Sequence, residues 1–207
     1  TTDTFRFGFH HEFTPGSDLI GSFYYNSMDE GYFWRPFSNP FPLDALFDNT
    51  GYGVELQHLY RTECLNIIAG MGHFDTSVDQ EFVFFGQSVL TENDSPHTNG
   101  YVYSQIHYPR NVTWTVGLSV DDFSGGNLNL DVTQVNPKFG VIWEPLPGTT
   151  FRGAAFRTLK RTLLTSQTLE PTQVAGFNQF FRDGEGTDAW RSEERRVGKE
   201  CRSWWLP

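Results

Sequence analysis

Two clusters of aromatic, amide and guanidinium side chains are the residues of this chain whose types could bind a ligand. They comprise Tyr32, Trp34 and Arg35, and then Phe177, Asn178, Gln179 and Phe180. Aromatic rings stack on ligands, while amide and guanidinium groups give hydrogen bonds that fix orientation. Neither segment shows the alternation of a strand, so we expect both in exposed loops, where binding residues often lie. The simpler interpretation, which the pattern favours, is that each loop packs on itself.

The carboxylates and histidines do not predict a metal site. Five carboxylates crowd one segment without strand alternation: Asp75, Asp79, Glu81, Glu92 and Asp94. Carboxylates can bind calcium, but this spacing matches no calcium-loop motif, so we expect a solvated acidic face. His10 and His11 are neighbours that would point to opposite faces of a strand. His58, His73 and His107 are scattered along the chain, and we expect structural roles for all five histidines.

No residue pattern predicts catalysis. Asp121 and Asp122 are adjacent, and adjacent strand residues point to opposite faces, so they cannot act as an acid/base pair. Asn111-Val112-Thr113 fits the glycosylation pattern but lies at an expected tight turn, and we discount it. The sequence contains no nucleophile elbow, phosphate loop or zinc motif. It therefore predicts a protein that is not an enzyme and that uses neither a cofactor nor a metal.

Alternation with a period of two residues predicts the elements that carry these side chains. From Phe5 to Phe13 the odd positions are nearly all Phe, and the even ones are polar or Gly. Such alternation indicates strands with one apolar and one polar face. Eight segments of this kind lie at 5–13, 18–26, 52–61, 64–74, 99–108, 112–121, 134–144 and 149–160. Strands of about 9–11 residues can cross a bilayer at a tilt.

The faces of these strands suit a membrane barrel. The apolar faces, which would meet lipid, carry Phe5, Phe7, Phe9 and Phe13, and Val112, Trp114, Val116, Leu118 and Val120. The polar faces, which would line the lumen, carry Arg6, His10 and Glu12, and Thr113, Thr115, Ser119 and Asp121. Tyr24-Tyr25 and Tyr101-Val102-Tyr103 put large side chains on both faces, so the orientation of their strands stays open. Tyr60, Tyr108 and Trp143 lie near expected turns and could belong to an interfacial aromatic girdle.

Short and long connections alternate along the chain. The short ones are Thr14–Ser17, Thr62-Glu63, Pro109–Asn111 and Pro145–Gly148, and the long ones are 27–51, 75–98, 124–133 and 161–190. Outer-membrane barrels have short turns on the periplasmic side and long loops outside. The sequence thus predicts an all-β fold, part of an antiparallel transmembrane β-barrel of about eight strands. The alternative is a soluble barrel or sandwich, which alternates in the same way.

Composition excludes several functions. The net charge is −10, and it falls to −12 without residues 191–207, which hold five Lys/Arg and three Asp/Glu. This acidity leaves no basic stripe for nucleic acid. No apolar run is long enough for a transmembrane helix. Outside 191–207 only Cys64 remains, so neither an intramolecular disulfide nor a cysteine-based metal site is expected.

The turn pattern also sets the expected direction of the chain. Segment 5–13 runs into a short turn, so it would descend from the outside towards the periplasm. Segment 149–160 leaves a short turn, so 161–190 would be an extracellular loop. A complete barrel of this class begins and ends in the periplasm. We therefore expect eight internal strands of a larger barrel, which would not fold well alone because both edges are open.

Two segments resemble the barrel domain of TonB-dependent outer-membrane receptors. Val135–Phe156 is similar to that family's Pro-Lys-x-Gly strand, short turn and following strand, and Thr168–Gln173 is similar to its Leu-x-Pro-Glu stretch, with Thr172 in place of Glu. The resemblance implies an outer-membrane location and uptake of a scarce nutrient, such as a ferric siderophore. It also implies a periplasmic energy-transducing partner, acting through a plug domain that is not in this sequence. Export or passive diffusion through a related barrel, and a soluble carbohydrate-binding β-domain, remain alternatives.

The segment Arg191–Ser203 resembles the translation of a short-read sequencing adapter. The chain would then divide into a partial barrel, 1–190, and a non-native tail, 191–207. Segments of this origin are excluded from the interpretation of a fold. We expect the tail to pack against nothing and to be absent from an intact copy of the gene.

Overall fold

The computed structural model describes residues 1–34, 43–84, 87–125, 130–159, 168–179 and 188–198. For residues 33, 34, 43, 44, 84, 130 and 188–198 it describes the backbone alone. Every regular element in these ranges is a strand, as the sequence predicts. No helix in the described ranges is long and apolar enough to span a membrane.

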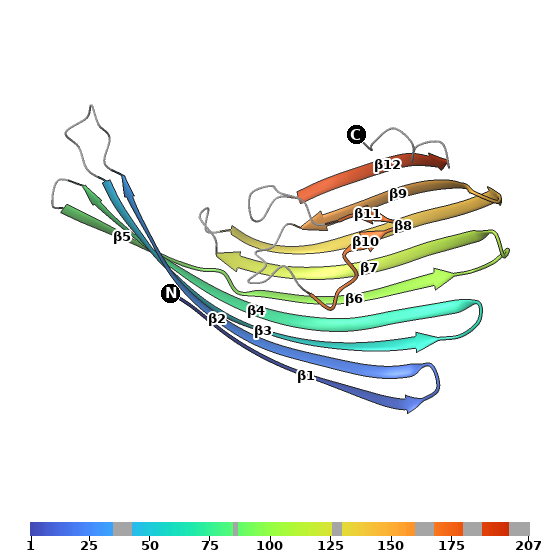
Figure 1. Cartoon of the computed structure of the whole chain (residues 1–207), viewed down its shortest axis with the longest axis horizontal. Helices are drawn as coiled ribbons and strands as arrows, with labels where there is room; N and C mark the ends of the chain where they lie inside the picture. Colours follow the sequence, from blue (N-terminus) through green and yellow to red (C-terminus); the bar gives the residue numbers. More distant parts are fainter. Residues whose placement is uncertain (35–42, 85–86, 126–129, 160–167, 180–187, 199–207) are drawn as a thin grey trace, which may run out of the picture.

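One curved antiparallel sheet forms almost the whole molecule (Figure 1). Its strands follow the order β1-β2-β3-β4-β6-β7-β8-β9-β12, and β5 pairs with the outer part of β4. Their bounds are β1 Thr2–Thr14, β2 Ser17–Trp34, β3 Leu43–Arg61, β4 Leu65–Phe84, β5 Gln87–Asp94, β6 His97–Ile106, β7 Val112–Gly125, β8 Leu130–Leu146, β9 Thr149–Leu159 and β12 Asp188–Gly198. The described strands form an open wall with edges at β1 and β12, as expected of part of a barrel.

All four expected short turns lie at one end of the sheet, on the right in Figure 1. Gly16 and Gly148 occupy two of these turns with φ of 85° and 81°. Such values lie in the left-handed region, which glycine enters without steric cost. The opposite end carries the long hairpins. The asymmetry of short and long connections is therefore confirmed.

The convex face of the wall is apolar and exposed, and the concave face is polar. On β7, Val116 and Leu118 are exposed, whereas Thr115 and Ser119 are buried. The open orientations are settled as well, because Tyr24, Tyr101 and Tyr103 are buried on the concave face, while Tyr25 and Val102 are exposed on the convex one. A soluble carbohydrate-binding β-domain would bury its apolar faces in a two-layer core. That alternative is wrong, because this wall is a single layer.

Tyr60, Tyr108 and Trp143, which were predicted for an aromatic girdle, are exposed close to the short turns. Trp143 belongs to the convex face of β8. The indole Nε1–H of Trp114 donates to the backbone oxygen of Tyr108 at 3.2 Å. This arrangement of aromatic groups fits the position expected at a membrane interface.

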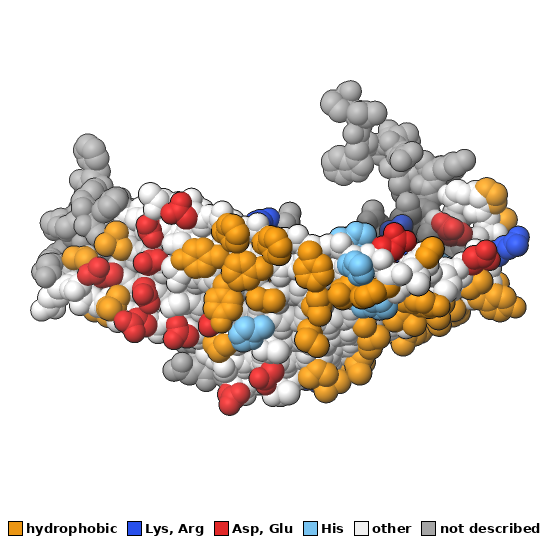
Figure 2. Space-filling view, turned by 90° about the horizontal axis from the view of Figure 1, so that it is seen from below, with side chains coloured by type: hydrophobic (Ala, Val, Ile, Leu, Met, Phe, Trp, Pro, Cys, Tyr) orange, Lys and Arg blue, Asp and Glu red, His pale blue; other side chains and the backbone are white. Residues whose placement is uncertain are grey.

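Two of the expected long loops, 27–51 and 75–98, are mostly strands, so this part of the prediction from the sequence is wrong. β2 runs on to Trp34 and β3 starts at Leu43, so most of 27–51 is a hairpin. Likewise β4 extends to Phe84 and β5 returns along it. These extensions project beyond the rest of the sheet, at the left of Figure 1. Figure 2 shows acidic side chains gathered towards that end and hydrophobic ones over the rest of the face.

The C-terminal region gives one further correction. Residues 168–179, which the sequence places in an extracellular loop, belong to the connection between β9 and β12 and fold onto the concave face of the wall. The tail was expected to pack against nothing, yet Arg191–Gly198 continues β12 and pairs with β9 in unbroken register. An edge strand presents unpaired backbone N–H and C=O groups, and these bind an extended chain whatever its side chains.

Candidate functional site

The segment 168–179, which we call the strap, crosses the concave face of the wall. It contains two short strands, β10 Gln173–Val174 and β11 Phe177–Asn178. The turn between them has φ of 50° at Ala175 and 85° at Gly176. Positive φ at both central residues is typical of a two-residue hairpin turn. Figure 1 shows this small hairpin in the hollow of the sheet, beside β8.

Polar side chains of β3 hold the first end of the strap. The carboxylate of Glu55 accepts hydrogen bonds from the Thr168 hydroxyl, at 2.5 Å, and from the backbone N–H of Leu169, at 2.9 Å. The amide of Gln57 donates to the backbone oxygen of Leu169 and to the hydroxyl of Tyr101. Both Glu55 and Gln57 are buried. Their polar groups are satisfied by the strap, as burial requires.

Glu170 fastens the middle of the strap to β6. Its side chain is 3% exposed. One carboxylate oxygen accepts from the Asn99 amide at 2.8 Å, and the other accepts from the Tyr103 hydroxyl at 2.9 Å. A buried carboxylate must be paired or hydrogen-bonded to be tolerated, and two donors from the wall serve that purpose here.

The far end of the strap packs against β6, β8 and β9. The Gln179 amide donates to the Tyr103 hydroxyl at 2.9 Å and also to the Pro171 backbone oxygen. Val174, Ala175 and Phe177 join the Tyr and Phe side chains of the wall in one buried apolar cluster. Close approach is possible because Gly140 has no side chain. A Cβ added there would come within 2.9 Å of both Ala175 Cβ and Val174 Cγ1.

A second polar network lies on the same face beside the strap. His97 Nε2 is 3.0 Å from one oxygen of Asp121. The other oxygen accepts from the Ser119 hydroxyl at 3.1 Å and from the Asn136 amide at 2.6 Å. Ser, His and Asp are all present, but the serine bonds to the aspartate and not to the histidine. The network thus lacks the nucleophile–base contact that acyl-transfer catalysis needs.

The structure separates the two predicted clusters. Tyr32 is two residues from the outer end of β2, and Figure 1 shows that end of β2 far from β10 and β11. Its ring is exposed and meets Phe47 edge to face, with centroids 5.7 Å apart. Its hydroxyl donates to the Glu30 carboxylate at 2.9 Å, which raises the pKa of the Tyr32 phenol. The Trp34 side chain and all of Arg35 lie outside the described residues.

In the second cluster, Phe177 and Gln179 are buried between the strap and the wall, whereas Asn178 is exposed. Phe180 lies outside the described residues. The strap therefore packs on the wall, a closer association than the self-packing loop that the sequence favours. A role in ligand binding stays a prediction for all seven residues of the two clusters.

Asp121 and Asp122 lie on opposite faces, as predicted, whereas the five carboxylates that were expected in a loop lie on β4 and β5. Asp121 is buried on the concave face, and Asp122 is exposed on the convex face, where it accepts from Thr133 at 2.6 Å. His10 contacts Asp18 at 2.8 Å and His58 contacts Ser17 at 3.0 Å. Within the described ranges, no three His, Cys, Asp or Glu side chains are grouped closely enough to hold a metal ion.

Five residues hold the strap and were not selected from the sequence: Glu55, Gln57, Asn99, Tyr103 and Glu170. Glu55 alternates with apolar neighbours in an expected strand, which predicts a lumen-facing side chain but no partner. Its partner lies more than a hundred residues away. Glu170 was noted only within the stretch Thr168–Gln173. The sequence contained no indication of the pairing between the strap and the wall.

Comparisons with known proteins agree with this architecture. The family described as TonB dependent receptor-like, beta-barrel, matches residues 1–188. The ferric citrate transporter FecA in its unliganded form is similar, with 10% identity and a TM-score of 0.61 over 76% of this chain and 27% of that chain. The alcaligin outer-membrane receptor FauA from Bordetella pertussis gives 12% identity and a TM-score of 0.43 over 78% of this chain and 36% of that chain. No curated protein sequence matches. The chain spans about a third or less of these receptors.

Proposed function

The chain belongs to the TonB-dependent receptor β-barrel family of the outer membrane, and from that premise we propose that it forms part of a gated uptake receptor. The expected substrate is a scarce nutrient, such as a ferric siderophore. Energy would come from a periplasmic partner, transmitted through a plug domain. Family membership favours a receptor over an enzyme, in line with the prediction from the sequence.

The observation that carries this proposal is the strap inside the barrel wall. Water-filled porins have an open polar lumen, while other barrels are plugged by polypeptide. Here Glu55, Asn99 and Tyr103 each bind the strap directly, and all three are buried. A lumen narrowed by a firmly bonded segment supports gated transport rather than passive diffusion.

The test uses the whole protein that carries this chain, expressed in cells that lack their own receptors for the probes. Accumulation is measured for ferric citrate, a ferric hydroxamate, cobalamin and a maltodextrin. We expect one probe to accumulate against its gradient, and a protonophore or loss of the periplasmic partner to abolish this. Entry of all four probes down their gradients, unchanged by the protonophore, would show a passive pore. Outward transport, with helical repeats encoded upstream, would show an exporter.

Among the described ligand candidates, Tyr32 and Asn178 have exposed side chains. We infer that Tyr32, near the outer end of β2, would meet a ligand before Asn178 does. Loss of a ring that contacts the ligand costs about 1–2 kcal/mol, which is roughly 5–30-fold in affinity. We therefore expect Tyr32→Ala to weaken binding of the accumulated probe by that factor. Tyr108→Ala, at an exposed tyrosine of the opposite end, is the control and should leave affinity unchanged.

A further inference from the structure

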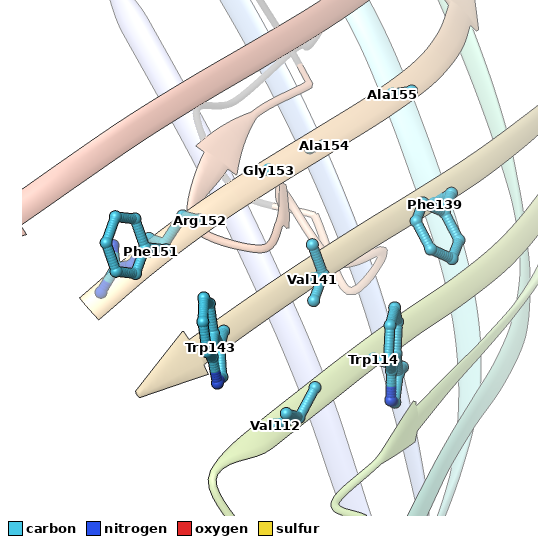
Figure 3. A pocket seen from close by; sticks show the side chains of 10 residues that line it. All are labelled: Val112, Trp114, Phe139, Val141, Trp143, Phe151, Arg152, Gly153, Ala154 and Ala155. Carbon is cyan, nitrogen blue, oxygen red and sulfur yellow. The ribbon is translucent and has the colours of Figure 1, made fainter. Parts of the chain in front are cut away.

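The convex face carries a groove of about 710 Å³ over β7, β8 and β9 (Figure 3). Strand register explains its shape. Trp143 lies opposite Phe151, and their rings stack with centroids 5.4 Å apart and planes 29° apart. One outward row further from the short turn, Val141 lies opposite Gly153. The two large stacked rings therefore lie beside Gly153, which has no side chain.

The opposite side of the groove is also aromatic. Phe139 and Trp114 lie with ring centroids 6.0 Å apart and planes at 41°. Phe139 is paired across strands with Ala155, another small residue on β9. Among the side chains that the structure describes, a Cβ added at Gly153 would meet only Val141 Cγ1, at the ordinary contact distance of 3.5 Å. As far as those side chains reach, the hollow above Gly153 and Ala155 is open and lies between two pairs of aromatic rings.

The groove lies on the face opposite the strap. The strap contacts the wall at Gly140, whose neighbours Phe139 and Val141 point the other way. The lining of the groove is continuous with the apolar surface of the wall, where Val116 and Leu118 are also exposed. It occurs in the half of the sheet that ends in the short turns. In the orientation that those turns indicate, this half faces the periplasmic leaflet.

We propose that the groove is a binding site for one acyl chain of a phospholipid from the periplasmic leaflet. The inference rests on the membrane placement in the proposed function but not on the transported substrate. An empty apolar hollow forfeits dispersion contacts on its open side, so the surrounding medium must fill it. In a bilayer, that medium is hydrocarbon. A flexible chain can lie in the groove. Aromatic rings then contact the chain on two sides, and Gly153 and Ala155 form the floor beneath it.

The form of the groove favours a lipid chain over a protein partner. A stable protein interface needs about 800 Å² from each partner and usually has a polar rim. This trough is only a few residues wide, and its neighbours on the convex face are themselves apolar. Trp143 lies next to the short turn, at a level where amphipathic aromatic side chains meet lipid headgroups. A lipid with its headgroup at that level would have its acyl chain at the depth of the groove.

The test exploits the open space above Gly153. In the whole protein that carries this chain, Gly153→Leu fills the groove from its floor without striking the backbone. Gly100→Leu is the matched control. It also adds a leucine side chain to the convex face of the wall, but on β6, where the nearest described atom to an added Cβ is the Gly70 backbone oxygen at 4.0 Å. The proteins are purified in mild detergent, and retained phosphatidylethanolamine is counted by native mass spectrometry.

We expect the unaltered protein and Gly100→Leu to retain one more phosphatidylethanolamine than Gly153→Leu does. A phosphatidylethanolamine with a diazirine on its acyl chain should label the peptide 139–155 at least several-fold more than the peptide 116–123. Equal retention by both variants and even labelling of the two peptides would overturn the proposal. So would a dimer that Gly153→Leu dissociates, since the groove would then be filled by a second copy. Neither the lipid count nor the labelling measures uptake. Failure of the transport assay would therefore not decide whether the groove binds an acyl chain.

Discussion

At the scale of single residues, two buried carboxylates join the strap to the wall, in addition to its apolar contacts. Glu55 and Glu170 are both buried, and each accepts two hydrogen bonds. These carboxylates lie at the polar face of the wall. There, donors such as Asn99 and Tyr103 make the hydrogen bonds that water would otherwise make. Removal of such a buried acceptor leaves its two donors unsatisfied at once.

Glu170→Ala tests this pairing. It removes the acceptor of the Asn99 amide and of the Tyr103 hydroxyl, and we expect a loss of about 1–3 kcal/mol in the free energy of unfolding. The control is Glu144→Ala, because Glu144 is exposed and receives only a long contact of 3.4 Å from Thr150. Both are measured by urea unfolding of the whole protein in detergent micelles. Equal losses in the two variants would mean that the Glu170 pairing contributes nothing.

At the scale of elements, the hairpins at the end opposite the short turns carry a row of like charges. Register places Asp29 opposite Asp48, Asp48 opposite Asp79, and Asp79 opposite Glu92. Four carboxylates therefore lie side by side across β2, β3, β4 and β5. Like charges directly opposite one another on a sheet destabilise it by roughly 0.2–1 kcal/mol per pair. The hairpins persist in spite of this row, because their backbone ladders are continuous.

Asp48→Asn removes two of these repulsive pairs and should stabilise the outer hairpins by up to about 1 kcal/mol, since repulsion between exposed charges is partly screened. Added sodium chloride should slow amide exchange in β2–β5 of the unaltered protein and have less effect in the variant. Asp131→Asn is the control, because Asp131 is exposed and lies opposite Ser124. Faster exchange in Asp48→Asn than in the unaltered protein would show that the row is bridged rather than repulsive.

The strap is the second element that can be tested alone. Gly140→Val would force a side chain into Val174 and Ala175, both within 2.9 Å of the new Cβ. Overpacking of this kind costs about 1–3 kcal/mol, and here the strap can yield more easily than the sheet. We expect limited proteolysis within 168–179 to accelerate several-fold and the ion conductance of the reconstituted barrel to rise. Gly100→Val, where an added Cβ has open space, should change neither.

Sequence alternation predicted those elements that have one apolar and one polar face. Phe5, Phe7 and Phe9 define such a strand, and β1 has the expected exposed aromatic face. The outer parts of β2 and β3 were not predicted because neither of their faces is uniformly apolar there: Asp29 lies opposite Asp48 on one face, and Glu30 lies opposite Phe47 on the other. Without lipid on one side, a strand needs no alternation of apolar residues.

The strap could not be predicted, for two physical reasons. Its turn, Ala175-Gly176, lacks the Asn-Gly or Asp-Gly pair that marks such hairpins in a sequence. Its partners Glu55 and Tyr103 are distant in the sequence, and nothing local specifies a contact of that range. For the same reason Phe177 and Gln179 looked like exposed ligand candidates, although both side chains are buried.

At the scale of the whole molecule, the described sheet is a wall rather than a closed barrel, with β12 along one edge. We propose that residues 191–207 are not native to this barrel, and that another strand of the natural protein lies beside β9. Sequencing the gene directly, without ligated adapters, should show different residues after Trp190 or Arg191. An unbroken frame through Arg191–Ser203 in that gene would refute this origin of the tail.

The pairing of β12 in the chain as it stands should then depend on its backbone and not on its side chains. Consecutive N–H groups of a strand point to opposite sides, so one of Glu194→Pro and Arg195→Pro must remove a hydrogen bond to β9. We expect that variant to lose amide-exchange protection around Gly153, which lies opposite Glu194. Glu194→Ala and Arg195→Ala should retain it, because alanine keeps the N–H. Equal loss in the alanine variants would mean that the tail side chains are recognised, and the segment would then behave as a natural strand.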